Sequence, residues 1–409
     1  MKYIVIVPDG MFDRPVKELG HKTPLEAADT PNMDAMADDG CVAKVKTIPG
    51  GFPPGSDIGN MALMGYDPKV SHRGRSPLEA ANLGVFLKDD EVAFRCNLVT
   101  VVDGVMKDYS AGHISTEEAD LLIKALNEKL SNDRIKFYTG TSYRHLLVLK
   151  TDDPARLMKI KTVPPHDILN KPAKAHLPSG KSQDILLDLM KASAGILTDH
   201  PVNTVRVDLK ENPANMIWLW GQGLRPTLPK FRDKFHVDGA VISAVDLVKG
   251  IGKLAGLDVI NVPGATGYYD TNYLGKAQYA LRALENKDFV YIHIEAPDEA
   301  GHNGDWKNKT WAIEQIDQHI VGTILNHFRK TGEEARILVC PDHPTPVELR
   351  THSNDPVGCV MWGKGIVKNH KRIYTETTVS ESDVAFDSGE SLMKFLWGSR
   401  KNSRWRALL

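Results

Sequence analysis

Short, nearly continuous apolar runs alternate along the chain with segments of helical periodicity. Three of the runs are rich in β-branched residues: 3–7 (Tyr-Ile-Val-Ile-Val), 289–294 (Phe-Val-Tyr-Ile-His-Ile) and 336–340 (Arg-Ile-Leu-Val-Cys). Continuous apolar strands are typical of a parallel sheet that is covered on both faces. Helical spacing is clearest at 309–329, and further helices are predicted at 116–129, 242–254 and 272–284. The pattern predicts an α/β fold, with a mostly parallel sheet between two layers of helices.

The middle of the chain has a different pattern. Between about residues 70 and 235, strand-like runs at 94–102, 145–150 and 203–207 are separated by loops rich in proline and histidine. This contrast predicts a smaller α/β domain, 71–235, inserted into a main domain built from 1–70 and 236–409. The segment 220–229, which contains two glycines and two prolines, is interpreted as the returning linker.

Composition and charge narrow the functional classes. Of the 409 residues, 42% are hydrophobic and 25% are charged, which is typical of a globular protein, and the net charge of −1 provides no field to attract nucleic acid or an anionic membrane. The basic cluster Arg400, Lys401, Arg404 and Arg406 is interpreted as a solvated tail. No run reaches the ~20 apolar residues that span a bilayer, and the apolar start is too short for a signal peptide.

Four cysteines lie far apart in the sequence and form no C-x-x-C motif. Cys41, Cys96, Cys340 and Cys359 are therefore expected to be buried free thiols in a reducing compartment. Together with the absence of a predicted leader or membrane span, this indicates a cytoplasmic protein.

Carboxylates follow each of the three apolar strands. Asp9, Asp298 and Asp342 come directly after runs 3–7, 289–294 and 336–340, and ligands of an open parallel sheet bind beyond the carboxyl ends of its strands. Three histidines accompany them, and the candidate metal ligands are therefore Asp9, Asp298, His302, Asp342, His343 and His352. Asp298 and His302 are four residues apart, a spacing that places both on one face of a helix. Mixed carboxylate and imidazole ligands suit zinc or manganese better than calcium.

A serine at a predicted helix start is the candidate nucleophile. In Pro54-Gly55-Ser56-Asp57-Ile58-Gly59-Asn60, glycine and proline favour a sharp turn, and a helix can begin directly after it. Ser56 would then lie at a helix N-terminus, where backbone N–H groups favour an anion, although most serines at such positions are ordinary caps. A serine hydroxyl is a weak nucleophile that metal coordination can activate.

These motifs resemble one known family. The Asp9-Gly10 opening, the segment 55–60, Pro297-Asp298-Glu299-Ala300-Gly301-His302, Pro341-Asp342-His343 and the segment 351–356 are similar, in the same order, to the cofactor-independent phosphoglycerate mutases of the alkaline-phosphatase superfamily. The likeness is to their shorter archaeal-type branch and covers nearly the whole chain. One departure is Asn60, where the longer mutases have a histidine.

The resemblance implies a reaction and its machinery. It implies interconversion of 2-phosphoglycerate and 3-phosphoglycerate, in glycolysis or gluconeogenesis, through a phosphoserine at Ser56. It also implies two divalent ions, typically Mn²⁺, with Zn²⁺, Mg²⁺ or Co²⁺ in some members. One ion would be held by Asp9, Ser56, Asp342 and His343, and the other by Asp298, His302 and His352.

The insert is expected to bind the substrate. Arginine matches both the phosphate and the carboxylate of a phosphoglycerate, so Arg95 and Arg144 are predicted substrate ligands, and Asn97 is a further candidate. His113 resembles the substrate-binding histidine of the family. Asp108 is the candidate general acid or base for the glycerate hydroxyls, and His113 is grouped with it as a catalytic residue. Arg73 and Arg75 are weaker candidates.

Two alternatives remain open at this level. A phosphomonoester hydrolase of the same superfamily would need water access and no glycerate clamp. A kinase-like relative would pass the phosphoryl group to another small alcohol such as homoserine, and the chain has no P-loop to support an ATP site.

Overall fold

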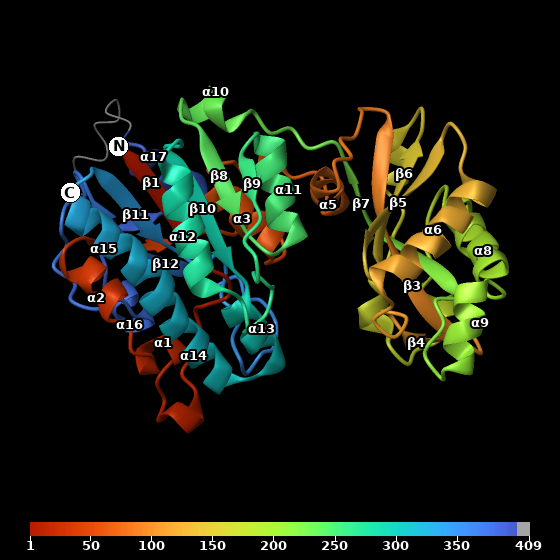
Figure 1. Ribbon diagram of the computed structural model, residues 1–409, viewed down its shortest axis with the longest axis horizontal. Helices are drawn as coiled ribbons and strands as arrows, with labels where there is room; N and C mark the ends of the chain where they lie inside the picture. The colour runs from red at the N-terminus through yellow and green to blue at the C-terminus, as the bar shows by residue number, and fades with distance from the viewer. Residues whose placement is uncertain (399–409) are drawn as a thin grey trace. The chain divides into compact units, whose positions relative to one another are not determined.

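The chain forms two compact units, each with its own sheet (Figure 1). The computed structural model describes residues 1–398, so the basic cluster at 400–406 lies outside the described residues. One unit comprises Met1–His72 and Thr227–Leu409, and the other comprises Arg73–Pro226. The insert was expected from the sequence to span 71–235, and in this division it spans 73–226. Across the described residues, no helix is both long enough and apolar enough to cross a membrane.

The discontinuous unit is built on an eight-stranded sheet in the order β13-β2-β12-β11-β1-β10-β8-β9. Its strands are β1 (Lys2–Pro8), β2 (Cys41–Val45), β8 (Gly239–Ile242), β9 (Asp258–Ile260), β10 (Phe289–Ile294), β11 (Ala335–Val339), β12 (Val357–Gly363) and β13 (Ala385–Phe386). All neighbours pair in parallel except β12, which is antiparallel to both β11 and β2. The predicted mostly parallel α/β fold is therefore confirmed, and the three apolar runs are adjacent strands.

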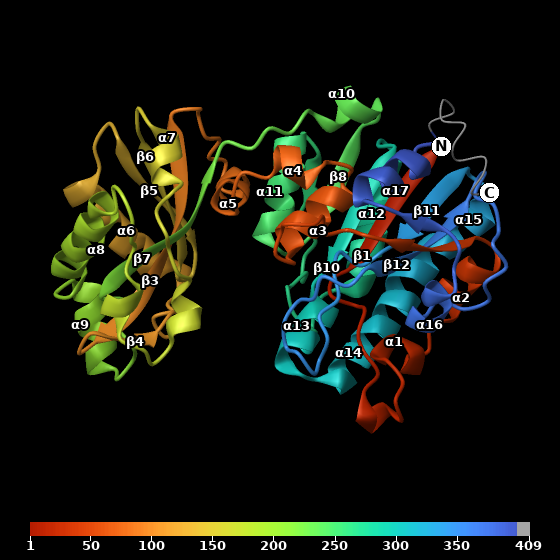
Figure 2. The same cartoon turned by 180° about the vertical axis from the view of Figure 1, so that it is seen from behind.

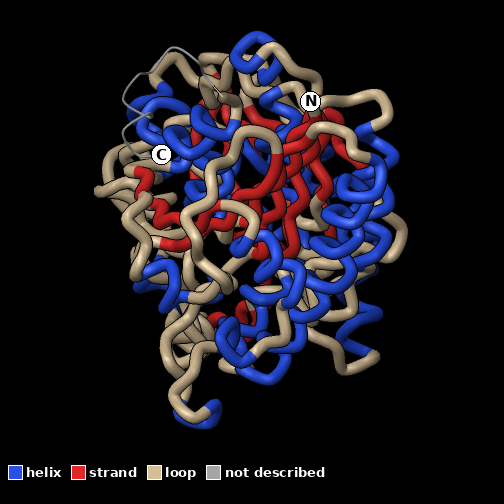
Figure 3. Tube along the Cα trace, turned by 90° about the vertical axis from the view of Figure 1, so that its left-hand side faces the viewer, coloured by secondary structure: helices blue, strands red, loops and turns tan. Residues whose placement is uncertain are grey.

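Helices cover both faces of this sheet. They are α1 (Pro24–Ala27), α2 (Pro31–Asp38), α3 (Ser56–Leu63), α4 (Pro68–Ser71), α10 (Phe231–Phe235), α11 (Asp246–Ala255), α12 (Tyr273–Leu284), α13 (Ala296–Asn303), α14 (Trp306–Gln315), α15 (Gly322–Thr331), α16 (Glu376–Ser380) and α17 (Gly389–Leu396). In Figure 1, α12 and α15 lie in front of the sheet, and in the reverse view of Figure 2, α3 and α17 lie in front of it. Figure 3 shows the strands enclosed between the helices.

One edge of the sheet collects the loops that carry the candidate ligands. Since β1 lies between β10 and β11 and all three run in parallel, their carboxyl ends meet at this edge. The antiparallel strand β12 begins at the same edge, and β2, antiparallel to β12, ends there. The loops after β1, β2, β10 and β11 and the loop before β12 therefore converge, although they are far apart in the sequence.

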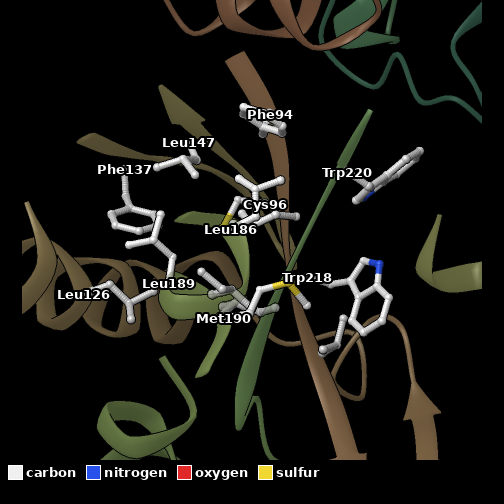
Figure 4. Packing of buried hydrophobic residues seen from close by; sticks show 14 of the residues in the cluster. Phe94, Cys96, Leu126, Phe137, Leu147, Leu186, Leu189, Met190, Trp218 and Trp220 are labelled. Carbon is white, nitrogen blue, oxygen red and sulfur yellow. The ribbon is translucent and has the colours of Figure 1, made fainter. Parts of the chain in front are cut away.

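The inserted unit carries an antiparallel sheet with helices packed against it. Its strands are β3 (Glu91–Val102), β4 (Val105–Asp108), β5 (Ile135–Thr141), β6 (Arg144–Lys150) and β7 (Met216–Leu224), and its helices are α5 (Ser76–Asn82), α6 (Thr116–Leu130), α7 (Pro154–Leu157), α8 (Asp184–Leu197) and α9 (Pro201–Asp208). Strand β3 is central and pairs with β4, β6 and β7. Phe94, Cys96 and Trp218 from the strands pack with Leu126 of α6 and Leu189 of α8 in its core (Figure 4).

Three local predictions were wrong. Residues 203–207 were expected to be a strand but lie in α9, because Pro201 opens a helix and the His200 side chain accepts the Val202 N–H. The β-branched Val205 and Val207 of this helix are exposed. The first part of the segment interpreted as a linker, 220–224, lies in β7, where it pairs with β3. The helix predicted from residue 242 begins only at α11, because residues 239–242 form β8.

Other local predictions are confirmed. The long helical segment at 309–329 is present as α14 and α15, joined by a π-helical turn at Ile316–Val321. Among the described residues, all four cysteines are free and buried.

Candidate active site

The candidate ligands lie at the edge of the main sheet where the loops converge. Asp9 directly follows β1, Asp298 lies in the first turn of α13 after β10, and Asp342 and His343 follow β11. His352 lies in the loop before the antiparallel strand β12, and so reaches the same edge from the opposite chain direction.

Asp298, His302 and His352 form one ligand group. The Nε2 atoms of His302 and His352 are 2.9 Å apart, and they lie 3.3 and 3.5 Å from the two oxygens of Asp298. His302 Nδ1 lies 3.1 Å from the Arg350 carbonyl oxygen, and His352 Nδ1 lies 3.3 Å from the Pro54 carbonyl oxygen. These contacts orient both imidazoles. Two ring nitrogens and a carboxylate that point at one another are a donor set for a transition metal.

Asp9, Asp342, His343 and Ser56 form a second group beside the first. His343 Nε2 lies 3.2 Å from Ser56 Oγ, 3.4 Å from Asp342 Oδ2 and 3.6 Å from Asp9 Oδ1. Asp9 is fully buried, and its Oδ1 has no hydrogen-bond partner among the described residues. An unpaired oxygen of a buried carboxylate is costly unless a cation is bound, so these residues fit a metal ion.

Ser56 is the first residue of α3, and Gly55 precedes it as the N-cap. Asn60, one turn further on, fixes this helix start: its Nδ2 donates to the Ser56 carbonyl at 2.9 Å and to Asp342 Oδ2 at 2.8 Å. Its Oδ1 accepts the Tyr291 hydroxyl at 2.7 Å. Asn60 therefore ties the candidate nucleophile to a candidate ligand.

Thr345 and Lys309 hold the loop after β11. The Thr345 hydroxyl donates to Asp298 Oδ1 and lies 3.2 Å from His343 Nδ1, so one side chain contacts a member of each ligand group. Lys309 is fully buried, and its Nζ donates to the Thr345 carbonyl at 2.8 Å and to Asp13 Oδ2 at 2.7 Å. Neither residue carries a motif that sequence reasoning could find, because their partners are distant in the chain.

The protonation of the carboxylates follows from their neighbours. Burial and the nearby Asp342 carboxylate raise the pKa of Asp9 well above its ordinary value. Burial acts in the same direction on Asp298, but hydrogen bonds from His302 and His352 outweigh it and hold the pKa of Asp298 well below the usual range. The same contact with Asp298 raises the pKa of His302 to about 9, so a metal ion must displace a proton there.

Sequence reasoning missed two polar residues beside these groups. His293 points from β10 to Asp9, with Nε2 2.8 Å from Asp9 Oδ2, and Glu295 is the residue before α13, with Oε2 3.7 Å from the same nitrogen. His293 could have been noticed in the sequence, because it is a histidine inside the otherwise apolar strand β10.

The predicted substrate residues lie in the inserted unit. Asn97 of β3 and Arg144 of β6 are partners in the strand register. Arg144 is exposed, and its guanidinium lies 5.5 Å from the Tyr143 ring, which His113 also contacts at 6.2 Å. Arg95 is mostly buried, with Nε 3.0 Å from Glu79 and its guanidinium 4.1 Å above the Trp220 ring. Glu79 thus already neutralises Arg95, whereas Arg144 has no ion-pair partner among the described residues.

Asp108 has strong local partners. Its carboxylate accepts the Ser110 N–H, the Ser110 hydroxyl and the Gly112 N–H, each at 2.7 Å, and Asn212 Nδ2 at 2.8 Å. Burial acts to raise the pKa of Asp108, but these hydrogen bonds outweigh it and lower the pKa. They also hold the turn before His113, whose own φ of 50° is left-handed. The carboxylate is suited to shaping this loop, and its predicted acid or base role stays a prediction.

Known proteins are similar to this chain over nearly its full length. A family model described as 2,3-bisphosphoglycerate-independent phosphoglycerate mutase matches residues 37–203. A protein of that name from Methanosarcina barkeri is 50% identical over 403 residues, which are 98% of each chain.

Two solved structures have the same fold. A Pyrococcus horikoshii protein, PH0037, aligns with a TM-score of 0.81 and 31% identity over 97% of this chain and 96% of its own. A cofactor-independent phosphoglycerate mutase from Thermoplasma acidophilum aligns with a TM-score of 0.66 and 28% identity, covering 97% of this chain and 99% of that one.

Proposed function

Because the chain belongs to the 2,3-bisphosphoglycerate-independent phosphoglycerate mutases, we propose that it interconverts 2-phosphoglycerate and 3-phosphoglycerate through a phosphoserine at Ser56. The observation that carries this proposal is the position of Ser56 Oγ, 3.2 Å from His343 Nε2 and beside two groups of buried carboxylates with imidazoles, of which His343 is buried and His302 and His352 are partly exposed. A hydroxyl at a helix start, next to residues that fit metal ions, is suited to accept a phosphoryl group.

Two divalent ions complete the proposed site. Asp9, Ser56, Asp342 and His343 would hold one ion, and Asp298, His302 and His352 would hold the other. When bound, such ions lower the pKa of a coordinated hydroxyl and neutralise the charge of a transferring phosphoryl group. The mixed oxygen and nitrogen ligands fit Mn²⁺, with Zn²⁺, Mg²⁺ and Co²⁺ as the other candidates.

The protein's own residues would supply the positioning. Ser56 Oγ takes the phosphoryl group from one hydroxyl oxygen of glycerate and returns it to the neighbouring oxygen. Arg144, His113 and Asn97 would retain glycerate during this exchange, and Arg95 would contribute less because Glu79 pairs with it. This reaction is a step of glycolysis and gluconeogenesis, which implies a cytoplasmic enzyme.

A single assay tests the reaction. The full chain, stripped of metal and then supplemented with Mn²⁺, is given 3-phosphoglycerate, and 2-phosphoglycerate is followed by coupling to enolase while inorganic phosphate is measured in the same sample. We expect isomerisation that a strong chelator abolishes and Mn²⁺ restores.

The outcomes separate the alternatives. If inorganic phosphate is the main product, the protein is a hydrolase and the mutase proposal is wrong. If isomerisation is indifferent to the chelator and elemental analysis finds no transition metal, the proposed metal centre is wrong.

A further inference from the structure

A buried arginine lies against the loop that carries His113. Arg206 belongs to α9 and is buried, although arginines mostly lie at the surface of proteins. We propose that Arg206 is a positioning residue, which holds residues 108–114 in the shape that presents His113 to the substrate. This inference rests on the proposed function, because the substrate role of His113 is part of it.

The loop has a backbone conformation that needs support. Three successive residues, Ala111, Gly112 and His113, have φ angles of 50°, 68° and 50°, in the left-handed region. Residues with a side chain rarely adopt this conformation, and it persists only where the surrounding contacts enforce it. Ala111 is buried and His113 is exposed, so the loop turns the imidazole outward. The contacts that enforce this turn therefore decide where His113 lies.

The Arg206 guanidinium supplies several of these contacts. Its Nη2 donates to the Ala111 carbonyl oxygen at 2.8 Å, at the first left-handed residue. Its Nε donates to the Asn212 carbonyl oxygen at 3.0 Å, and Asn212 Nδ2 donates to Asp108 Oδ2 at 2.8 Å. The same carboxylate oxygen accepts the Gly112 N–H. Arg206 thus acts on the loop directly at Ala111 and also through Asn212.

Two glutamates balance the charge of the arginine. Arg206 Nη1 lies 2.9 Å from Glu118 Oε2 and 3.1 Å from Glu211 Oε2. The glutamate side chains are 34% and 51% exposed, whereas that of Arg206 is 3% exposed. The glutamates can therefore be hydrated without Arg206, and its loss should free the loop rather than unfold the unit. Only the rigid five-donor fork of arginine can serve all of these acceptors at once.

The loop shares its surroundings with another proposed substrate residue. The rings of His113 and Tyr143 are 6.2 Å apart, and the Arg144 guanidinium lies 5.5 Å from the same tyrosine ring. The Ser142 hydroxyl donates to the Ile114 carbonyl oxygen at 2.7 Å, which joins the end of the loop to the turn before β6. A displacement of about 1 Å in such a group can cost on the order of 10²-fold in rate, so the shape of the loop matters for the reaction.

A double-mutant cycle tests the inference. The full-length protein, supplemented with Mn²⁺, is assayed for isomerisation of 3-phosphoglycerate as Arg206→Gln, as His113→Ala and as the double variant. We expect Arg206→Gln to raise the KM by about tenfold. The double variant should be no worse than His113→Ala alone, because Arg206 acts through His113. Arg206→Lys keeps the charge but loses the fork, and its KM should lie between those of the wild type and Arg206→Gln.

The matched control is Asn203→Ala. Asn203 is another buried polar residue of α9, and its Nδ2 donates to the carbonyl oxygens of Leu197 and Ala214. This variant should keep the wild-type KM. Hydrogen exchange followed by mass spectrometry reports on the loop without substrate. Peptides that cover 108–114 should exchange faster in Arg206→Gln and at the wild-type rate in Asn203→Ala.

The outcomes separate this inference from the proposed function. If the wild type isomerises and Arg206→Gln leaves the KM unchanged, or if the effects of the two substitutions multiply in the double variant, the inference is overturned and the proposed function stands. Unchanged exchange of 108–114 in Arg206→Gln also overturns it. If the wild type does not isomerise 3-phosphoglycerate, both fail. Circular dichroism melting checks folding, and Arg206→Lys takes the place of Arg206→Gln in the cycle if the latter does not fold.

Discussion

At the scale of single residues, contacts rather than burial alone decide which side chains are charged in this site. Asp9 and Asp298 are both almost completely buried, yet the pKa is raised in the first and lowered in the second. Burial and the carboxylates of Asp342, Asp298 and Glu295 raise the pKa of Asp9, although His293 Nε2 lies 2.8 Å from its Oδ2. At Asp298, hydrogen bonds from His302 and His352 outweigh burial. A carboxylate crowded by other carboxylates needs a cation to stay ionised.

Replacement of Ser56 by alanine tests the nucleophile directly. We expect Ser56→Ala to lower turnover by about 10³-fold or more, because the acceptor oxygen is lost, while the circular dichroism spectrum is unchanged. Acid-quenched protein incubated with phosphate-labelled substrate should carry label in the wild type and none in the variant. The matched control is Ser380→Ala, an exposed serine of α16, which should keep wild-type turnover. Full activity in Ser56→Ala would refute the assignment.

Replacement of Arg144 by alanine tests what retains the substrate. A held glycerate has an effective concentration on the order of 10⁵ M in well-oriented cases, far above that of water at about 55 M. Loss of the guanidinium in Arg144→Ala should therefore slow isomerisation and raise the fraction of phosphoryl groups released as inorganic phosphate. Both products are measured in one reaction.

The control for this variant is Arg134→Ala, another exposed arginine of the inserted unit, which pairs with Asp152. It should leave both rates at their wild-type values. If Arg144→Ala also leaves them unchanged, the arginine is not part of the clamp, and the mutase proposal is unaffected.

At the scale of secondary-structure elements, polar atoms buried in strands make local stability depend on pH. His145 is the second residue of β6, and its Nδ1 accepts the Gly140 N–H at 3.1 Å. Its Nε2 has no partner among the described residues. Burial lowers the pKa of this imidazole to about 3, so His145 is neutral in the folded protein at neutral pH.

We predict that His145 weakens the inserted unit in acid. In the unfolded chain its pKa returns to about 6.5, so between pH 6.5 and 3 the unfolded state binds a proton that the folded state does not. The free energy of unfolding should therefore fall with falling pH, by up to about 1.4 kcal/mol per pH unit from this group. Urea unfolding at pH 7 and pH 5 measures it. His145→Gln should show a smaller loss than the wild type, and the control His176→Gln should show the same loss as the wild type.

At the scale of the whole molecule, the candidate functions are divided between two units. The proposed metal ligands and Ser56 belong to the discontinuous unit, and the proposed substrate residues belong to the insert. Each unit has its own core, such as the Phe94 and Trp218 cluster of the insert (Figure 4). A ligand that binds only one folded unit stabilises that unit by mass action.

Metal binding should therefore protect the two units unequally. With Mn²⁺ at 100 times its dissociation constant, the discontinuous unit should gain about 2.7 kcal/mol against unfolding. Hydrogen exchange followed by mass spectrometry should show slower exchange in peptides of β1, β10 and β11 and little change in peptides of β3, β5 and β6. Asp342→Asn should remove this protection. Equal protection of the insert would show that the metal is not confined to the unit that holds the predicted ligands.

The sequence alone determined the elements whose signal is local. Runs of β-branched residues predicted β1, β10 and β11, because a strand buried on both faces must be apolar throughout. The aspartates after these strands were recognisable as candidate ligands, because parallel strands end at a common edge. Asp298 and His302 were recognisable as a pair, because their spacing is that of one helical turn. The strand predicted at 203–207 was wrong because the helix start at Pro201 outweighed the β-propensity of these residues.

Only the tertiary structure decided which distant residues meet. Only the family resemblance grouped His352 with Asp298 beforehand; the antiparallel course of β12, which brings the two to within 3.5 Å, leaves no mark in the residue pattern itself. The same holds for Tyr291 on Asn60 and for His293 on Asp9, contacts that join residues more than 200 positions apart. The pattern of apolar and polar residues shows whether a side chain faces a core. Which side chains hydrogen-bond within that core depends on how the strands pair, and the packing of the whole sheet determines that pairing.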